Sequence, residues 1–177
     1  MKRLILLLSL ILITTAASAT HTVGALRIKQ GSWSAIKDDN ATAYVCFDYS
    51  ETKWFLNQSY EEHCGDTYEL RTGLSLTDFI ASFNENSKGL KMSTDIIGAK
   101  YYICFNISNM EQWQMSSMYG RLSTFVHGEI EVLDMASGEI LCKIAVKGHS
   151  GNEDYVPEDR ISKCFKSLAK RLVKLKK

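Results

Sequence analysis

The last segment of the chain, PEDRISKCFKSLAKRLVKLKK (residues 157–177), has the pattern of an amphipathic helix. Pro157 suits the first helical position, and Glu158 and Asp159 place negative charge at the positive end of the helix dipole. The apolar residues recur at steps of three and four and therefore share one face: Ile161, Cys164, Phe165, Leu168, Leu172 and Leu175. A helix with one apolar face needs a second layer to cover it, so the preceding residues must supply that layer.

Several earlier segments have the pattern of β-strands. They are rich in aromatic and β-branched residues, which favour strands. These segments are TAYVCFDYS (42–50), AKYYICFNIS (99–108), RLSTFVHGEIEVLDM (121–135) and GEILCKIAVKG (138–148). The last two flank Ala136-Ser137-Gly138, which predicts a β-hairpin. Residues 25–36 form a weaker pattern that predicts a first strand or hairpin arm.

One more helix is predicted between the strands. The segment SLTDFIASFNENSKG (75–89) begins with Ser75 as N-cap and ends at Gly89. Its apolar face consists of Leu76, Phe79, Ile80 and Phe83. Residues 51–73 are polar and without a clear period, so we expect a loop with room for one short helix.

The order of these elements predicts the fold. A strand, a helix and a strand between residues 42 and 108 favour a right-handed parallel crossover. The hairpin then extends the sheet, and the final helix packs beside the first. We therefore expect a single α+β domain, a two-layer sandwich with a four- to five-stranded mixed sheet and two helices on one face.

The first residues, MKRLILLLSLILITTAASA, have the order of a secretory signal peptide. Lys2 and Arg3 precede an apolar run, and Ala17-Ser18-Ala19 is a small-residue cleavage site. The run is shorter than the roughly 20 residues of a membrane-spanning helix. We expect residues 1–19 to be removed and residues 20–177 to form one exported domain, periplasmic or secreted. We expect no transmembrane helix, because no second long apolar run follows, and no lipid anchor, because no cysteine lies near the cleavage site.

Charge is distributed unevenly along the chain. Residues 157–177 contain eight basic and two acidic residues, a net charge of +6, whereas residues 20–156 contain 11 basic and 18 acidic residues, a net charge of −7. The acidic body would repel phosphate, so nucleic acid is not an expected partner. We interpret the basic side chains of the last helix as its solvated face, and contact with an anionic membrane surface is the alternative. These side chains are Lys163, Lys166, Lys170, Arg171 and Lys174.

Motifs for common cofactors and reactions are absent from the sequence: there is no GxGxxG, GxxxxGK[ST], HExxH or GxSxG. The histidines, His21, His63, His127 and His149, lack the spacing of metal ligands. Residues 148–151, Gly-His-Ser-Gly, suggest a nucleophile but have the composition of an ordinary connection. The sequence therefore predicts no catalytic site, no cofactor and no metal site, and favours a non-enzymatic protein over an enzyme whose site assembles only in space.

The chain contains five cysteines, Cys46, Cys64, Cys104, Cys142 and Cys164. Three of them lie in predicted strands and Cys164 lies on the apolar side of the last helix, so we expect most to be small core residues. Cys64, beside His63 in a polar stretch, is the expected reactive or bridging exception. An odd number leaves at least one thiol unpaired within the chain, and the pairing stays open.

Residues 109–120, NMEQWQMSSMYG, are unusually rich in methionine and aromatic residues for a connection between strands. One interpretation is that they cover an end of the sheet. The functional alternative is an adaptable apolar contact for a partner, a role that suits methionine. Its residues would be Met110, Trp113, Met115, Met118 and Tyr119. Binding of soft copper by the thioethers is less favoured, because no histidine or cysteine lies at ligand spacing.

Several segments together resemble an uncharacterised family of secreted proteins from Bacteroidales-type bacteria. The resemblance covers most of residues 31–176, and FDYSETKW and EDRISKCFKSLAK are its most specific parts. The other segments are AYVCFDYSETKW, FNENSKGLKM, AKYYICFNIS and GEIEVLDMASGEILCKIAV. More loosely, the layout is similar to domains of unknown function in Gram-negative envelope lipoproteins. The resemblance implies an exported envelope domain and no particular activity.

Two hypotheses about function follow. In the first, the chain is an exported, non-enzymatic envelope domain that binds another protein or envelope component. In the alternative, it is a peripheral membrane-surface protein that uses the basic helix 157–177.

Overall fold

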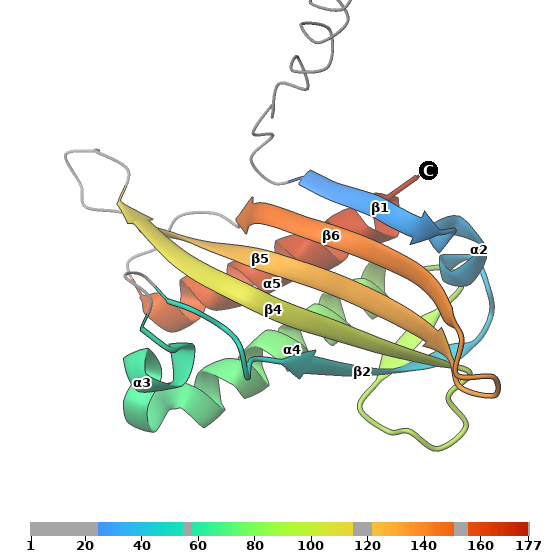
Figure 1. The fold of residues 1–177 in the computed structure, drawn as a ribbon, viewed down its shortest axis with the longest axis horizontal. Helices are drawn as coiled ribbons and strands as arrows, with labels where there is room; N and C mark the ends of the chain where they lie inside the picture. Colours follow the sequence, from blue (N-terminus) through green and yellow to red (C-terminus); the bar gives the residue numbers. More distant parts are fainter. Residues whose placement is uncertain (1–24, 55–57, 115–121, 151–155, 177) are drawn as a thin grey trace, which may run out of the picture.

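The computed structural model describes residues 25–54, 58–114, 122–150 and 156–176 (Figure 1). The predicted signal peptide, residues 1–19, lies outside these ranges. The strands are β1 (Ala25–Gly31), β2 (Thr42–Asp48), β3 (Lys91–Ser93), β4 (Tyr101–Gln114), β5 (Leu122–Asp134) and β6 (Ile140–Ser150). The helices are α2 (Trp33–Lys37), α3 (Tyr60–Cys64), the 3₁₀ turn η2 (Gly65–Thr67), α4 (Tyr68–Asn86) and α5 (Pro157–Lys174).

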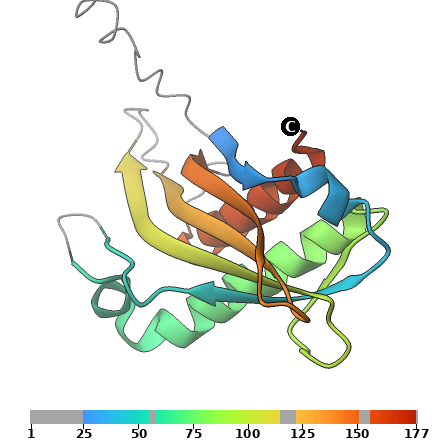
Figure 2. The same ribbon diagram turned by 45° about the vertical axis from the view of Figure 1, so that its right-hand side comes forward.

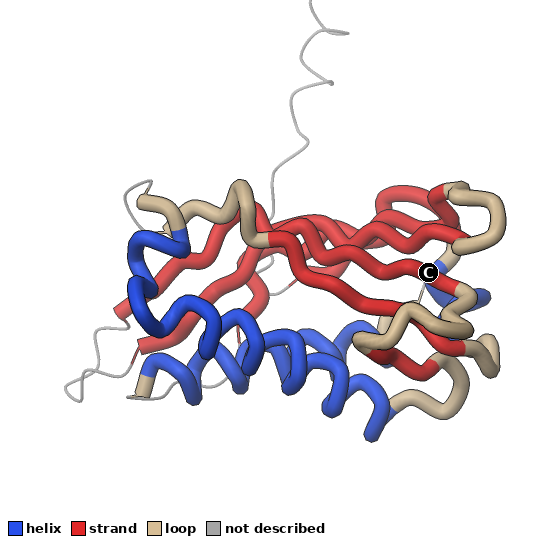
Figure 3. The backbone as a smooth tube through the Cα atoms, turned by 90° about the horizontal axis from the view of Figure 1, so that it is seen from below, coloured by secondary structure: helices blue, strands red, loops and turns tan. Residues whose placement is uncertain are grey.

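The strands form one mixed sheet with the order β1-β6-β5-β4-β2-β3. Helices α4 and α5 lie side by side on one face of this sheet, and the opposite face is not covered by them (Figures 1 and 3). The predicted two-layer α+β architecture is confirmed, with six strands instead of four or five. The weaker strand predicted within residues 25–36 is β1, which pairs with β6 at one edge, although the second part of that segment belongs to helix α2. The strand that the sequence does not predict is the three-residue β3, which pairs with β2 at the other edge.

The predicted connections are also confirmed. Strands β2 and β4 are parallel neighbours, with α4 and β3 between them in the sequence. Strands β5 and β6 form the antiparallel hairpin. Its turn is stabilised by Asp134, whose Oδ1 accepts hydrogen bonds from the backbone N–H of Ala136 at 3.0 Å and of Ser137 at 2.8 Å. Strands β4 and β5 extend this antiparallel arrangement.

Helix α4 begins earlier than the sequence analysis predicts. It starts at Tyr68, so Ser75 is not an N-cap but a buried residue in the middle of the helix, where its Oγ donates to the Arg71 carbonyl at 2.7 Å. The preceding segment is helical too, because Ser59 and Glu62 form a capping box at the start of α3. The polar residues 51–73 are therefore only partly a loop.

Phe47 of β2 lies where both layers meet. Its ring centroid is 5.2 Å from that of Phe79 on α4, 5.5 Å from that of Phe105 on β4 and 5.2 Å from that of Phe165 on α5. Four more residues of the predicted stripe are buried, with Ile161, Cys164, Leu168 and Leu172 at most 2% exposed, and Leu175, just after the end of α5, is partly buried. The interpretation of this segment as a packed core helix is confirmed. Among the helices of the described residues, none has the combination of length and apolar character that crossing a membrane requires.

The C-terminal end of α5 is held by residues from the beginning of the described chain. The last carbonyls of a helix lack partners within the helix. Here the Trp33 Nε1–H of α2 donates to the Leu172 carbonyl at 2.8 Å, and the Lys37 ammonium donates to the Val173 carbonyl at 3.1 Å. Trp33 is itself fully buried. These two hydrogen bonds join α2 to the end of α5, two segments more than 130 residues apart in the sequence.

Replacement of Leu168 by alanine should destabilise the domain strongly, because its side chain is fully buried between α5 and the sheet. The expected loss of unfolding free energy is about 2–5 kcal/mol. The matched control is Lys170→Ala on the exposed side of the same helix, which should change the unfolding free energy by no more than about 0.5 kcal/mol. Urea titrations of both variants measure the difference, and equal losses would contradict the packed position of α5.

Candidate functional site

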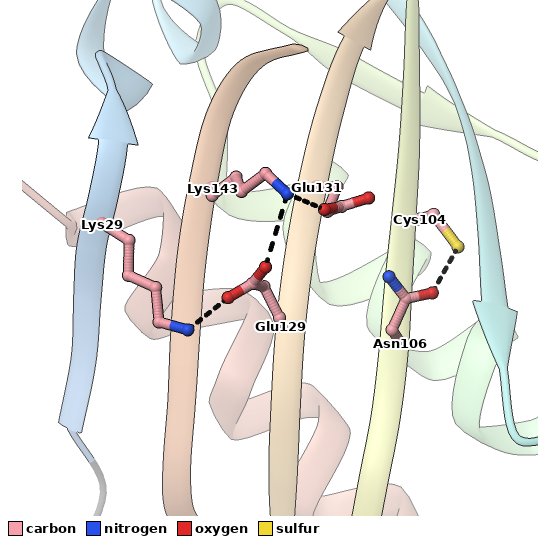
Figure 4. A network of polar contacts seen from close by, with 6 residues as sticks. All are labelled: Lys29, Cys104, Asn106, Glu129, Glu131 and Lys143. Carbon is pink, nitrogen blue, oxygen red and sulfur yellow. Dashed lines mark hydrogen bonds and ion pairs between the residues drawn. The ribbon is translucent and has the colours of Figure 1, made fainter. Parts of the chain in front are cut away.

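The face of the sheet opposite α4 and α5 carries a row of charged side chains (Figure 4). Lys29 of β1 approaches Glu129 of β5, with Nζ and Oε2 2.5 Å apart. Lys143 of β6 lies between the two glutamates of β5, 3.8 Å from Glu129 and in direct contact with Glu131. The four charges neutralise one another, so this row favours neither an anionic nor a cationic ligand.

Two cysteines lie beside this row. Cys46 of β2 and Cys104 of β4 are direct partners in the parallel register, and Cys104 is also the register partner of Glu131. The Cys104 thiol donates to Asn106 Oδ1 at 3.2 Å (Figure 4). Cys46 Sγ lies 3.0 Å from the Tyr102 hydroxyl. Both cysteines are half-buried.

The two thiols differ in acidity because they interact with each other. The neighbouring Cys104 thiol is the largest cause that lowers the pKa of Cys46 to about 6, and the Tyr102 hydroxyl contributes to the lowering. The proximity of Cys46, together with burial, raises the pKa of Cys104, since its deprotonation would place two negative charges together. The site therefore combines a thiolate with a neighbouring thiol, the chemistry of a nucleophilic cysteine.

These cysteines lie in strands, as the sequence predicts, but their pairing across β2 and β4 is visible only in the structure. Cys64, the predicted reactive exception, is buried, and its sulfur accepts a hydrogen bond from Arg71 at 3.8 Å. The adjacent His63 ring stacks on Trp54 at 4.1 Å. The two neighbours therefore contact different groups and do not form a nucleophile–base pair. All five cysteines are free thiols in this structure.

His149 and Ser150 lie at the end of β6 and do not form a catalytic pair, because successive side chains of a strand point to opposite faces. His149 is 1% exposed, and neither of its ring nitrogens has a hydrogen-bond partner in the described part of the chain. Burial, together with the charge of Arg171, lowers the pKa of His149 to about 4. This histidine is a neutral core residue.

The methionine-rich segment is only partly described. Residues 109–114 belong to strand β4 and are not a connection, as the sequence analysis had them. Met110 is fully buried and so presents no surface to a partner. For Trp113 the backbone is described, paired with Ser123, but not the side chain. Met115, Met118 and Tyr119 lie outside the described residues, and their role in partner binding stays a prediction.

The basic residues of α5 lie on its solvent side. Five of them are exposed: Lys163, Lys166, Lys170, Arg171 and Lys174. We call this set the basic face. Lys166 reaches across to α4, where its Nζ is 3.1 Å from Asp78 Oδ1. The predicted solvated face is confirmed in position, and its use as an anion contact stays a prediction.

A group of exposed apolar residues that the sequence analysis did not identify lies at one end of the sheet. Ile96 and Ile97 belong to the loop between β3 and β4, and Met135 and Ile140 belong to the β5–β6 hairpin. Ile97 is 84% exposed and Ile96 is 52% exposed. The two segments lie side by side (Figures 1 and 2), joined by a hydrogen bond from the Met135 N–H to the Lys100 carbonyl at 2.9 Å. We call these four residues the apolar end.

The loop that carries Ile97 is held by side-chain hydrogen bonds. Asp95 Oδ1 accepts from the Ile97 N–H at 2.9 Å, and Ser93 Oγ accepts from the Asp95 N–H at 2.9 Å. Gly98 then takes a positive φ of 75°, which suits glycine. The sequence signal was the pair Ile96-Ile97 in a polar segment, where no strand or helix periodicity explains two large apolar residues.

Comparison with known proteins identifies no family for this chain. No protein-family model matches the sequence, and no curated protein matches it. Among solved structures, the dodecamer of PelC from Paraburkholderia phytofirmans matches in two crystal forms. The TM-scores are 0.47 and 0.46, with 12% and 10% identity over 87% of this chain and 98% and 100% of PelC. A Xanthomonas campestris protein of the DUF330 family has a TM-score of 0.38 and 5% identity, over 77% of this chain and 83% of its own.

Within the described ranges, no three His, Cys, Asp or Glu side chains come together as a metal site. The chemical features that the structure does assemble are therefore the cysteine pair on the uncovered sheet face, the basic face of α5 and the apolar end.

The buried His149 predicts a loss of stability in mild acid. Its pKa is about 4 in the folded chain and 6.5 ordinarily, so between these values the unfolded chain binds a proton that the folded chain excludes. The free energy of unfolding therefore has its full value above pH 6.5 and decreases as the pH falls towards 4, by up to about 1.4 kcal/mol per pH unit. Urea unfolding at pH 7 and pH 5 measures it. His149→Leu should lose less stability than the wild type over this interval, and identical losses would contradict the assignment.

Proposed function

We propose that this chain is an exported, non-enzymatic binding domain of the cell envelope, and that it contacts a protein partner through the apolar end. One observation carries the proposal. Four large apolar side chains are exposed together at one end of the sheet, and Ile97 is almost wholly in solvent. Exposed apolar groups rimmed by polar residues are typical of interaction surfaces.

The surroundings of the apolar end support this role. Charged side chains lie next to it in the same two segments, namely Asp95, Lys100, Asp134 and Glu139. A partner would therefore find an apolar centre with a polar rim, the usual composition of a protein interface. The pattern favours a protein partner with an apolar pocket over a sugar or a nucleic acid.

The rigidity of the loop also supports binding. Hydrogen bonds to Ser93 and Asp95 fix the loop backbone, and Asp39 anchors its far end by accepting from Lys100 Nζ and from the Tyr101 hydroxyl, each at 2.6 Å. Ordering a mobile loop costs affinity, so a loop that is already ordered binds more tightly for the same contacts. Loops positioned by a rigid scaffold commonly carry function.

The proposal adds a second surface to the one that the sequence predicted. Strand β4 begins at Tyr101, beside the apolar end, and its described part ends at Gln114, within the methionine-rich segment 109–120. The described residues of that segment lie at the end of β4 that is far from the apolar end, and the two surfaces can be tested with separate variants.

A photo-crosslinking amino acid at position 97, introduced in the producing cells, should give a discrete crosslinked product. The matched control is position 70, where Leu70 at the start of α4 is also an exposed apolar residue, 56% exposed. Position 70 should give no such product, and adding Ile96→Ser and Met135→Ser should reduce the yield at position 97. Equal crosslinking at both positions, or none at position 97, would count against the apolar end as a binding surface.

The alternative function, binding to an anionic membrane surface, is favoured by one observation, the exposure of the basic face. Basic residues near an anionic surface contribute about 1 kcal/mol each. The apolar stripe of α5 is already in the core, so the contact that we propose in this case uses charge alone and does not insert the helix into lipid.

Vesicles of phosphatidylcholine with phosphatidylglycerol test this alternative. Binding should occur at low salt, should disappear with phosphatidylcholine alone, and should weaken about 100-fold when Lys163, Lys170 and Lys174 become glutamine, at about 1 kcal/mol each. The control removes three charges from β1 and β6, with Arg27, Lys29 and Lys147 changed to glutamine. Equal effects of the two triple variants, or no binding by the wild type, would exclude a specific role for the basic face.

A further inference from the structure

Two cysteines lie opposite each other on neighbouring strands of the sheet. Cys46 and Cys104 are direct register partners of the parallel strands β2 and β4. Neighbouring strands lie about 4.8 Å apart. A disulfide needs two Cα atoms roughly 4.4–6.8 Å apart, so the backbone positions of this pair are compatible with one.

Accessibility distinguishes this pair from the other cysteines. Cys46 and Cys104 are half-buried. The Cys104 side chain lies on the sheet face that the helices leave uncovered (Figure 4), and its register partner Cys46, which alternates with the buried Val45, lies on the same face. Cys64, Cys142 and Cys164 are at most 7% exposed. A dissolved oxidant can therefore reach the pair but not the three core thiols while the domain is folded.

The neighbours of the two sulfurs give them different roles. The Cys104 thiol, on the register partner of Cys46, and the Tyr102 hydroxyl, 3.0 Å from Cys46 Sγ, lower the pKa of Cys46 to about 6. Cys46 is then the attacking thiolate near neutral pH. The proximity of Cys46 and burial raise the pKa of Cys104, so this thiol stays protonated, and it donates a hydrogen bond to Asn106 Oδ1. Attack by one thiolate followed by resolution with a second thiol is the mechanism of thiol–disulfide exchange.

We propose that Cys46 and Cys104 form a reversible disulfide across β2 and β4, by exchange with a low-molecular-weight disulfide such as oxidised glutathione. The Cys46 thiolate attacks one sulfur of glutathione disulfide and releases one glutathione thiolate, which takes up a proton. The Cys104 thiol then loses its proton, attacks the Cys46 sulfur and releases the second glutathione. The two protein thiols are oxidised by two electrons, and one glutathione disulfide is reduced to two glutathione molecules.

The accessibility of the pair makes this disulfide reversible. Both cysteines are half-buried on the uncovered sheet face, so a dissolved thiol can reach the bond once it has formed. Exposed disulfides are the labile ones. This site lies on the uncovered sheet face and is independent of the apolar end.

The experiment uses the folded wild-type protein in buffers with graded ratios of oxidised to reduced glutathione. After the exchange is quenched with acid, free thiols are alkylated and the peptides are mapped by mass spectrometry. We expect one linked pair, Cys46 with Cys104, that forms as the ratio rises and disappears when reduced glutathione is restored. Iodoacetamide at neutral pH should also modify Cys46 at least tenfold faster than Cys64, Cys142 or Cys164.

Single variants separate the two roles. Cys104→Ser should leave Cys46 as a stable mixed disulfide with glutathione, whereas Cys46→Ser should give neither product. Cys64→Ala is the matched control and should form the linked pair like the wild type. A linked pair that includes Cys64, a persistent mixed disulfide at Cys46 in the wild type, or both thiols free at every glutathione ratio would each overturn the proposal. The iodoacetamide rates of the wild type provide a test that needs no variant to fold.

Discussion

Burial of the apolar side of α5 is the interaction on which the rest of the structure depends. Phe165 of this helix packs against Phe47 of β2, whose ring also contacts Phe105 of β4 and Phe79 of α4. This contact joins the last element of the chain to the middle of the sheet. It also determines the direction of every other side chain of α5, because a helix that buries one stripe must turn its opposite side to solvent. The basic face is therefore a consequence of core packing.

The same packing leaves one face of the sheet uncovered. With α4 and α5 on one side, alternate residues of each strand point to the other side. The charged row and Cys104 lie there (Figure 4), as does Cys46, the register partner of Cys104. Half-buried positions of this kind need polar side chains that satisfy one another, as Lys143 and Glu131 do. A thiol can also occupy such a position, but a dissolved oxidant can reach it there, whereas a thiol buried in the core is protected.

Local patterns in the sequence were sufficient to predict the α5 stripe, the β5–β6 hairpin and the parallel β2–β4 pair. They were insufficient for features that depend on pairing between distant segments. The contact of Cys46 with Cys104 requires the register of two strands more than 50 residues apart, and periodicity within each strand carries no information about register. The early start of α4 was missed because residues 68–74 lack a regular apolar stripe. The Ser59–Glu62 capping box was a signal of helix in this region. Ile97 belongs to no periodic element, so its exposure became visible only in the structure.

The position of α5 also limits how the chain could meet a membrane. If the helix left the sheet and entered lipid, its own stripe would be buried again, but Phe47, Phe79 and Phe105 would lose their cover. Exposure of a large buried side chain costs about 1.5–3 kcal/mol, and a whole domain is stable by only about 5–15 kcal/mol. Release of α5 would therefore unfold the sandwich instead of producing an inserted arm. Any membrane contact must therefore occur with the core intact, through the charges of the basic face. Because Phe165 and Leu168 stay buried in the core, such a contact would be electrostatic binding at the membrane surface and not insertion of the helix.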